Sequence, residues 1–145
     1  MFDHPKFAEI VLSVCEFTFE EMLFYEVMMS DDQNYVSSKE EIILSINVES
    51  PINHRLCLVM PKTMIFEMAD MLYAGSMEIS DDILIDFVAE LLNTFTGRIV
   101  SELFPDEKNT FLSIPKHEEK IPFDMSKCRL LALEVEGEKL YFIAE

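Results

Sequence analysis

A long amphipathic helix is the sequence feature that most constrains how this chain folds. Between Ser80 and Phe104 the apolar residues recur at intervals of three and four, so on a helix of about 100° per residue they share one side. Ser80 is a favourable N-cap, and Pro105 ends the pattern. The apolar side has to be buried against another layer. The opposite side carries Asp86, Glu90, Asn93, Thr94, Gly97 and Ser101.

The net charge limits the classes of partner. The chain has 145 residues, a length that favours a single domain spanning 1–145. Its 28 acidic residues outnumber its 11 basic residues, which gives a formal charge of −17. Nucleic acids and anionic membranes attract the opposite charge, so we exclude both as partners. A protein with a basic patch is the more compatible partner.

The titratable residues give no sign of a disulfide framework, a metal site or a self-contained catalytic triad. Three isolated cysteines flanked by apolar residues are typical of small core side chains, and three scattered histidines lack the spacing of metal ligands. The N-terminus lacks the basic region of a signal peptide, and no apolar run approaches the ~20 residues that span a bilayer. These features predict a cytoplasmic protein. The residues concerned are Cys15, Cys57, Cys128, His4, His54 and His117.

The remaining segments predict an α+β fold. It has two layers, with a mostly antiparallel sheet and long helices packed on one of its faces. Short connections at Ser50-Pro51 and Glu136-Gly137 predict two antiparallel hairpins. The pattern predicts helices over 5–25 and 61–73, strands over 42–48, 55–60, 109–114, 128–135 and 138–143, and polar loops over 30–41 and 116–127.

Glu90 and Asn93 are three positions apart on the long helix, so their side chains are neighbours on its polar side. Solubility alone explains an acid and an amide on many helices, and that interpretation remains open. However, Asn is a poor residue for the middle of a helix, and Gly97 costs about 1 kcal/mol there relative to Ala. A helix that keeps both on one side is therefore a candidate for a surface function.

A faint internal repeat relates the two long helical segments. The segment from Cys15 to Phe19 aligns with the segment from Asn93 to Gly97, so that Leu12 falls on Glu90 and Cys15 on Asn93. This alignment predicts that the first helix has lost an equivalent polar pair. A chance match is the alternative.

Glu90-x-x-Asn93, Gly97 and then Pro115, 22 positions after the asparagine, form a pattern that resembles the CheC/CheX family of chemotaxis phosphatases. The likeness is closest to CheX, because one Glu-x-x-Asn pair stands beside a degenerate first repeat. One departure exists: many relatives have a glycine shortly after the proline, where this chain has Lys116 to Lys120 without one.

The resemblance implies hydrolysis of the aspartyl phosphate on a CheY-type response regulator. Asn93 would hold the attacking water, and Glu90 would pair with a lysine of the receiver. Any Mg²⁺ would belong to the receiver, and this chain would need no cofactor. The alternative is a non-catalytic binding module, as in flagellar switch proteins of the FliM/FliY type. Tyr141, Phe142 and Ile143 predict that the C-terminal strand is an apolar sheet edge, so we also expect a homodimer, with strand pairing at this edge as one route. The expected receiver contacts are Asp86, Thr94, Gly97, Ser101 and Pro115.

Overall fold

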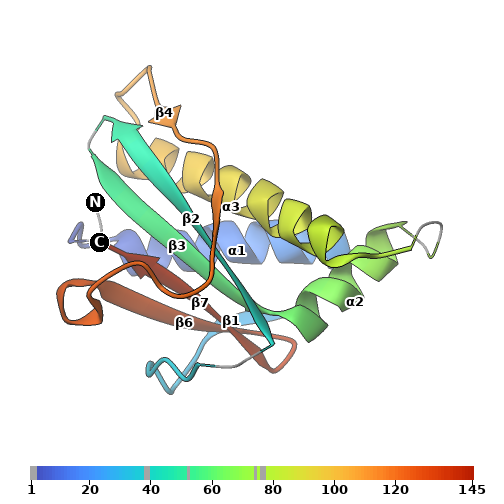
Figure 1. The fold of residues 1–145 in the computed structure, drawn as a ribbon. Coiled ribbons are helices and arrows are strands. Elements are labelled where there is room, and N and C mark those ends of the chain that lie inside the picture. The colour runs from blue at the N-terminus through green and yellow to red at the C-terminus, as the bar shows by residue number, and fades with distance from the viewer. Residues whose placement is uncertain (1–2, 38–39, 52, 74, 76–77) are drawn as a thin grey trace.

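Three helices cover one face of a single antiparallel sheet. The computed structural model describes residues 3–37, 40–51, 53–73, 75 and 78–145. Within them, α1 (Phe7–Leu23), α2 (Lys62–Tyr73) and α3 (Asp81–Leu103) lie on the same side of a seven-stranded sheet (Figure 1). The strands are β1 (Val27–Met29), β2 (Glu41–Ser50), β3 (His54–Pro61), β4 (Phe111–Leu112), β5 (Lys116–Glu118), β6 (Arg129–Val135) and β7 (Glu138–Ala144). The predicted α+β architecture is confirmed.

All strand pairs are antiparallel, and two hairpins form the centre of the sheet. The strand order is β1-β6-β7-β3-β2-β4, and β5 pairs with the same edge of β2. The β2–β3 hairpin pairs Leu44 with Leu58. The β6–β7 hairpin turns at Glu136 and Gly137, whose φ angles of 51° and 82° suit a two-residue turn. Both predicted hairpins are therefore confirmed.

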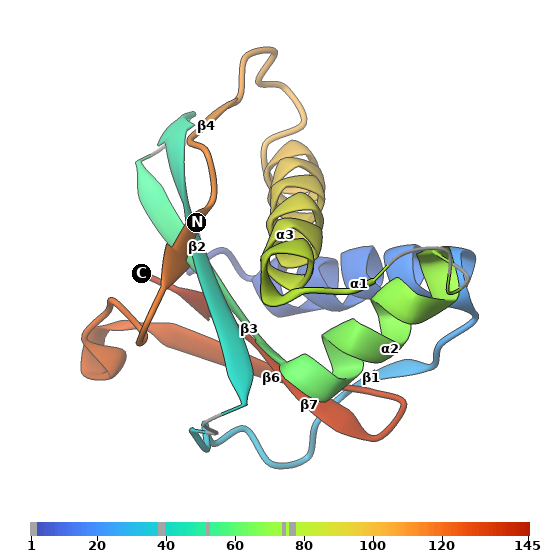
Figure 2. The same cartoon turned by 45° about the vertical axis from the view of Figure 1, so that its right-hand side comes forward.

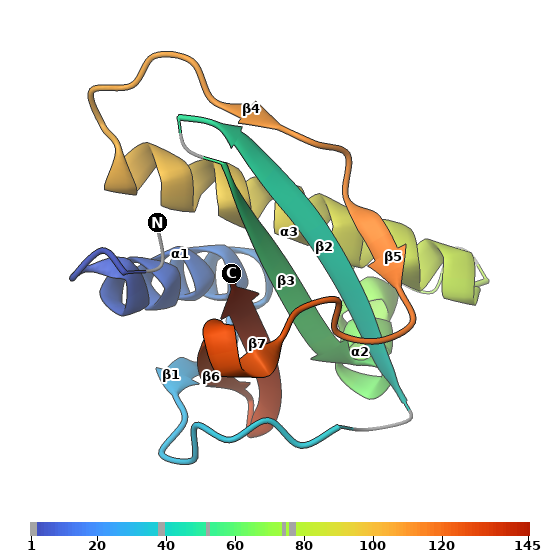
Figure 3. The same ribbon diagram turned by 60° about the vertical axis from the view of Figure 1, so that its left-hand side comes forward.

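The sheet is also covered on its second face, by loops. Ile43, Val59 and Tyr141 point away from the helices and pack with Phe123 in a smaller apolar cluster. Tyr35 joins this cluster from the segment that connects β1 to β2. Figures 2 and 3 show the 3₁₀ turn η1 (Met125–Lys127) and the chain around it on the side of the sheet opposite to the helices. The three α-helices thus lie on one face of the sheet, and the loops with η1 lie on the other.

The edge strands differ from the prediction. The strand expected over 109–114 is reduced to Phe111–Leu112, and β5 lies in a segment predicted to be a polar loop. The three-residue strand β1 was not predicted at all. These strands are too short to show a period of two, and pairing with β2 or β6 decides their conformation instead.

The C-terminal strand is not an edge. β7 pairs with β3 on one side and β6 on the other, and Tyr141, Phe142 and Ile143 are all buried. The expectation of a dimer through this strand is therefore wrong, because its backbone groups are already paired. The edges of the described sheet are β1 on one side and β4 with β5 on the other.

Helices α1 and α3 contact each other while running in opposite directions. Phe19 packs edge-on against Phe95, with ring centroids 5.6 Å apart. All eight buried positions of α1 coincide with buried positions of α3 after a shift of 77 residues, from Phe7 and Leu84 to Leu23 and Val100. The repeat inferred from sequence places Cys15 on Asn93, so its shift differs by one residue from the shift that matches the buried positions. No helix in the described residues is both long and apolar enough to cross a membrane.

The repeat alignment inferred from sequence is wrong at this register. It places Cys15, which is fully buried, on the exposed Asn93. It also places Phe17, which is 51% exposed, on the fully buried Phe95. Burial instead matches Ser13 to Glu90 and Glu16 to Asn93.

Candidate functional site

The polar side of α3 forms an exposed ridge. Asp86, Glu90, Asn93 and Ser101 are exposed, whereas Gly97 is half-exposed. We call these five residues the α3 ridge. Thr94 borders them and is also half-exposed. The structure thus displays on one open surface the six residues predicted on this helix.

The buried side of α3 holds the ridge in place. Leu91, Leu92 and Phe95 lie directly beneath it in the main core, each no more than 5% exposed. The helix begins where the Ser80 hydroxyl accepts a hydrogen bond of 3.4 Å from the Ile83 amide. Because the helix is anchored in this way, the backbone positions of Glu90 and Asn93, and hence the spacing between the two residues, are fixed before any partner binds.

Glu90 and Asn93 have no partner within the described part of the chain. Neither side chain takes part in a hydrogen bond or an ion pair there, and no solvent-excluding contact covers them. Fixed but unpartnered polar groups are available to a ligand. Asn93 offers both an amide donor and a carbonyl acceptor, and Glu90 offers only acceptors when ionised.

Pro115 lies on a different element from the other candidate residues. It is half-exposed in the connection between β4 and β5, and Ile114 before it is 89% exposed. The segment after it, where many relatives have a glycine, continues directly into β5, which pairs Lys116 with Ser45 and Glu118 with Ile43. This pairing fixes the path of the chain beyond Pro115.

The ridge is an open surface and not a cavity. A hollow of about 600 Å³ lies elsewhere, on the loop-covered side of the sheet, where Tyr35, Glu41, Ile43 and Lys120 line it. In the described residues no group of three or more His, Cys, Asp or Glu side chains is arranged to hold a metal ion. An open ridge of this kind has room for a second protein rather than an enclosed small substrate.

The two buried cysteines supply no nucleophile. Cys128 is only partly buried and packs against the smaller cluster, so the prediction of a core side chain holds fully for Cys15 and Cys57 alone. Cys15 and Cys57 are fully buried, and all three cysteines are free thiols. Desolvation by burial raises the pKa of the Cys57 thiol to about 12 and raises the pKa of the Cys15 thiol further. These thiols therefore stay protonated near neutral pH, as expected of core side chains.

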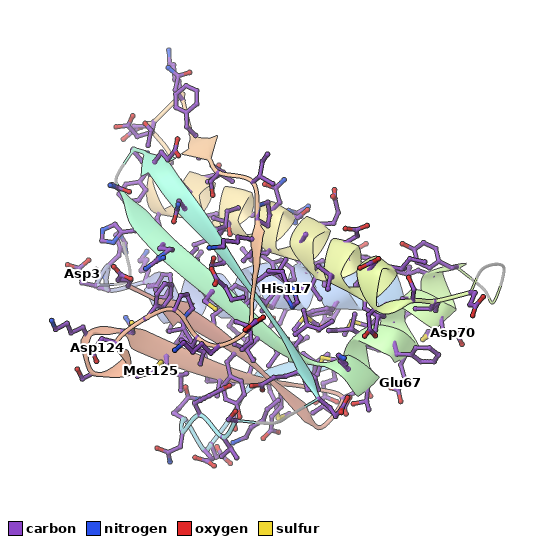
Figure 4. The ribbon with its side chains drawn as sticks, in the orientation of Figure 1. Asp3, Glu67, Asp70, His117, Asp124 and Met125 are labelled. Carbon is purple, nitrogen blue, oxygen red and sulfur yellow. The ribbon has the colours of Figure 1, made fainter. Side chains whose placement is uncertain are left out.

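Acidic side chains extend far beyond the ridge. Glu67 and Asp70 project from α2, at the opposite end of the molecule from Asp124 of η1 (Figure 4). On α3 itself, Asp81 has a basic partner in Lys62, whose Nζ lies 3.5 Å from its Oδ2. Most of the surface therefore presents a negative potential to an approaching protein.

Sequence reasoning missed one basic group beside the ridge. The guanidinium of Arg98 lies over the ring of Phe17, with its Cζ 4.5 Å from the ring centroid. No local spacing links these residues, because Phe17 belongs to α1 and Arg98 to α3. The one sequence feature that could have drawn attention to Arg98 is that it is the single basic residue of an acidic helix.

The fold is that of CheX and CheC-like chemotaxis proteins. The chain is similar to the crystal structure of CheX from Vibrio vulnificus, with a TM-score of 0.74 and 11% identity over 97% of this chain and 98% of that one. It is also similar to CheX in the CheX-CheY-BeF3-Mg²⁺ complex from Borrelia burgdorferi, with a TM-score of 0.65 and 16% identity over 95% and 96%. FliY from Thermotoga maritima gives a TM-score of 0.62 and 20% identity over 99% and 91%.

The sequence identifies the family within this class. Residues 42–129, more than half of the chain, match the family model described as chemotaxis phosphatase CheX. The chain belongs to the CheX family. No curated protein matches the chain. The structural neighbours, at 20% identity or less, establish the fold alone.

Proposed function

We propose that this chain is a phosphatase that removes the aspartyl phosphate from a CheY-type response regulator. The observation that carries the proposal is the exposed pair Glu90 and Asn93, fixed on α3 and without partners in the described chain. Membership of the CheX family supports the reaction class. We expect the activity in the cytoplasm, as the family also suggests.

The chemistry requires little from this chain. An aspartyl phosphate is an acyl phosphate and is already labile, so no covalent nucleophile is needed. Catalysis consists mainly of aligning a water molecule in line with the phosphorus–oxygen bond that breaks. The Asn93 carboxamide can accept a hydrogen bond from that water and donate another to a phosphoryl oxygen. Water then bonds to phosphorus, and the receiver's aspartate leaves as a carboxylate.

Glu90 positions Asn93 on the receiver in this proposal. Its carboxylate forms an ion pair with a lysine beside the receiver's phosphorylation site, and the helix transmits that position to Asn93 one turn away. Mg²⁺ is held by the receiver and offsets charge on the phosphoryl group. Asp86, Thr94, Gly97, Ser101 and Pro115 contribute to the receiver contact.

A structural neighbour supports the type of partner. The Borrelia burgdorferi protein with this fold was crystallised with CheY carrying BeF3 and Mg²⁺. BeF3 is a chemical stand-in for a phosphoryl group, which supports a phosphorylated receiver as the partner we propose for the present chain. The open ridge of the present chain is compatible with a partner of the same size.

A non-catalytic binding module is the second candidate. The similarity to FliY, with a TM-score of 0.62, favours it, because the same fold serves more than one function. Such a module would bind a receiver or another signalling protein without changing the lifetime of the phosphate.

We also propose that the protein forms a homodimer, although the buried C-terminal strand cannot provide the interface. The exposed backbone of β1 or of β4 and β5 offers the remaining sheet edges. Light scattering at micromolar concentration tests this proposal. A monomeric mass would contradict it.

Phosphate release distinguishes the two functions. Receivers from the same genome are phosphorylated with a small phosphodonor, mixed with this chain and Mg²⁺, and followed by a phosphate sensor. We expect release well above the receiver's own rate with at least one receiver. Binding to BeF3-activated receiver without faster release would support the binding module and contradict the phosphatase.

A further inference from the structure

Arg98 is placed to act in docking, next to the ridge but outside the proposed catalytic pair. It lies five residues after Asn93, which is roughly 7–8 Å along the helix axis and about 140° around it. It is exposed, and it directly follows Gly97 of the ridge. Arg98 therefore borders the ridge on the flank nearer to Thr94 and Ser101, and it points away from Asn93.

The contact with Phe17 orients the guanidinium. Phe17 is 51% exposed on α1, and the Cζ of Arg98 lies 4.5 Å from the centre of its ring. An arginine stacked on an aromatic face loses part of its rotational freedom, yet its in-plane N–H groups remain able to grip a carboxylate in a bidentate manner. The stacked arginine is thus a preorganised donor.

No carboxylate of the described chain satisfies this donor. Glu102 lies four residues later on α3, the spacing at which helical ion pairs form, but Arg98 forms no ion pair with it or with any other described acid. In a chain with a formal charge of −17, an unpaired arginine beside an exposed ridge is unusual.

The charge changes sign along α3 between Glu90 and Arg98. Arg98 is the one basic residue of the helix, with Asp81, Asp82, Asp86 and Glu90 before it and Glu102 after it. The proposal pairs Glu90 with a lysine of the receiver, and a receiver carboxylate at the edge of the contact would complement Arg98. The order from acid at Glu90 to base at Arg98 therefore complements such a receiver better in one orientation than in the reverse one.

We propose that Arg98, held by Phe17, binds a carboxylate of the receiver at the edge of the contact with the ridge and thereby fixes the orientation in which α3 docks. This proposal rests on the proposed receiver partner. It assigns Arg98 a positioning role that affects encounter and affinity, while the chemical step stays with Asn93 and the receiver.

The test separates docking from chemistry. Arg98→Gln is compared with wild type for binding to BeF3-activated receiver and for phosphate release. We expect the Kd and KM to rise about tenfold and kcat to stay within about twofold, because a rim charge contributes to association more than to the chemical step. The gap between the two proteins should narrow as the salt concentration rises.

Three further variants make the result specific. Arg98→Lys keeps the charge but loses the planar fork, so it should recover only part of the affinity. Phe17→Leu should raise the Kd several-fold, because Arg98 loses its support. Lys127→Gln removes the same charge from exposed η1 on the opposite side of the sheet (Figure 2) and should leave the Kd unchanged.

The outcomes distinguish this proposal from the proposed function. If wild type binds and hydrolyses but Arg98→Gln has the same Kd and KM, the docking role of Arg98 is excluded and the phosphatase stands. If wild type binds without hydrolysis and Arg98→Gln still binds about tenfold more weakly, the phosphatase is excluded and the docking role stands. A loss of kcat alone, or an equal effect of Lys127→Gln, overturns the docking role.

Discussion

Helices α1 and α3 bury equivalent positions but present different outer surfaces. Their buried residues match over the whole length of α1, and Phe19 and Phe95 meet where the helices contact each other. On the outer side, however, α1 has Ser13 and Glu16 where α3 has Glu90 and Asn93. The core requirement is shared, whereas the carboxylate-and-carboxamide pair occurs on one helix only. Packing therefore does not account for that pair.

The largest expected effect tests the buried sides of α1 and α3, which both helices pack into the core. Phe19→Ala and Phe95→Ala should each lower the free energy of unfolding by about 3–5 kcal/mol, because each removes a buried ring at the helix contact. Chemical denaturation measures both losses. The exposed Phe17→Ala is the control and should cost less than about 1 kcal/mol. A small cost for either buried ring would contradict the account of the packing between α1 and α3.

The second-largest expected effect tests the difference between the outer surfaces of α1 and α3. Asn93→Ala should reduce the rate of phosphate release on the order of 10²-fold, because the water loses its positioning group. Glu16→Ala, at the matching position of α1, should leave the rate unchanged. Unfolding curves confirm that both variants are folded. Equal loss in the two variants would show that the helices are not functionally distinct.

A smaller effect concerns Gly97. A Cβ atom at this position would meet no other atom within 4 Å, so Gly97→Ala should stabilise the helix by about 0.5–1 kcal/mol. The same methyl group would occupy the space needed by the receiver backbone, and binding should weaken several-fold. Ser13→Ala, on the outer side of α1, is the control for a small change on an exposed helix surface and should leave binding unchanged. Unchanged binding of Gly97→Ala would place Gly97 outside the contact.

The smallest effect compares two buried threonines. The Thr18 hydroxyl donates to the Val14 carbonyl at 3.0 Å, whereas the buried Thr96 hydroxyl has no hydrogen-bond partner in the described structure. Thr96→Val should therefore raise the free energy of unfolding by about 1 kcal/mol, and Thr18→Val should lower it by up to about 1 kcal/mol. Thermal unfolding measures both shifts. The opposite order would show that the Thr96 hydroxyl is satisfied.

Residues with strong local signals made most of the fold predictable from sequence. The N-cap at Ser80 and the turn at Glu136-Gly137 act within a few residues, so the pattern located α3 and the β6–β7 hairpin correctly. Strand order depends on contacts between distant segments. The sequence therefore did not reveal that β7 is central or that β5 completes an edge.

In the candidate site, too, the features set by local sequence were predictable and the features set by contacts between distant segments were not. Helical periodicity was enough to place Glu90 and Asn93 together on an exposed face. The contact of Arg98 with Phe17 depends on how two helices pack. The repeat alignment was wrong by one residue, because two identical residues do not define which positions of a helix are buried. Periodicity thus predicts a face of a helix, but not what lies beside that face.

The central claim is that the Glu90–Asn93 ridge completes the active site of a receiver. A crystal structure of this chain with a receiver carrying BeF3 and Mg²⁺ tests it most directly. The account predicts the Asn93 carboxamide within hydrogen-bond distance of the BeF3 group or of a water in line with it, and the Glu90 carboxylate against a receiver lysine. A receiver bound to the outer side of α1, or to the loop-covered face of the sheet, would contradict the claim.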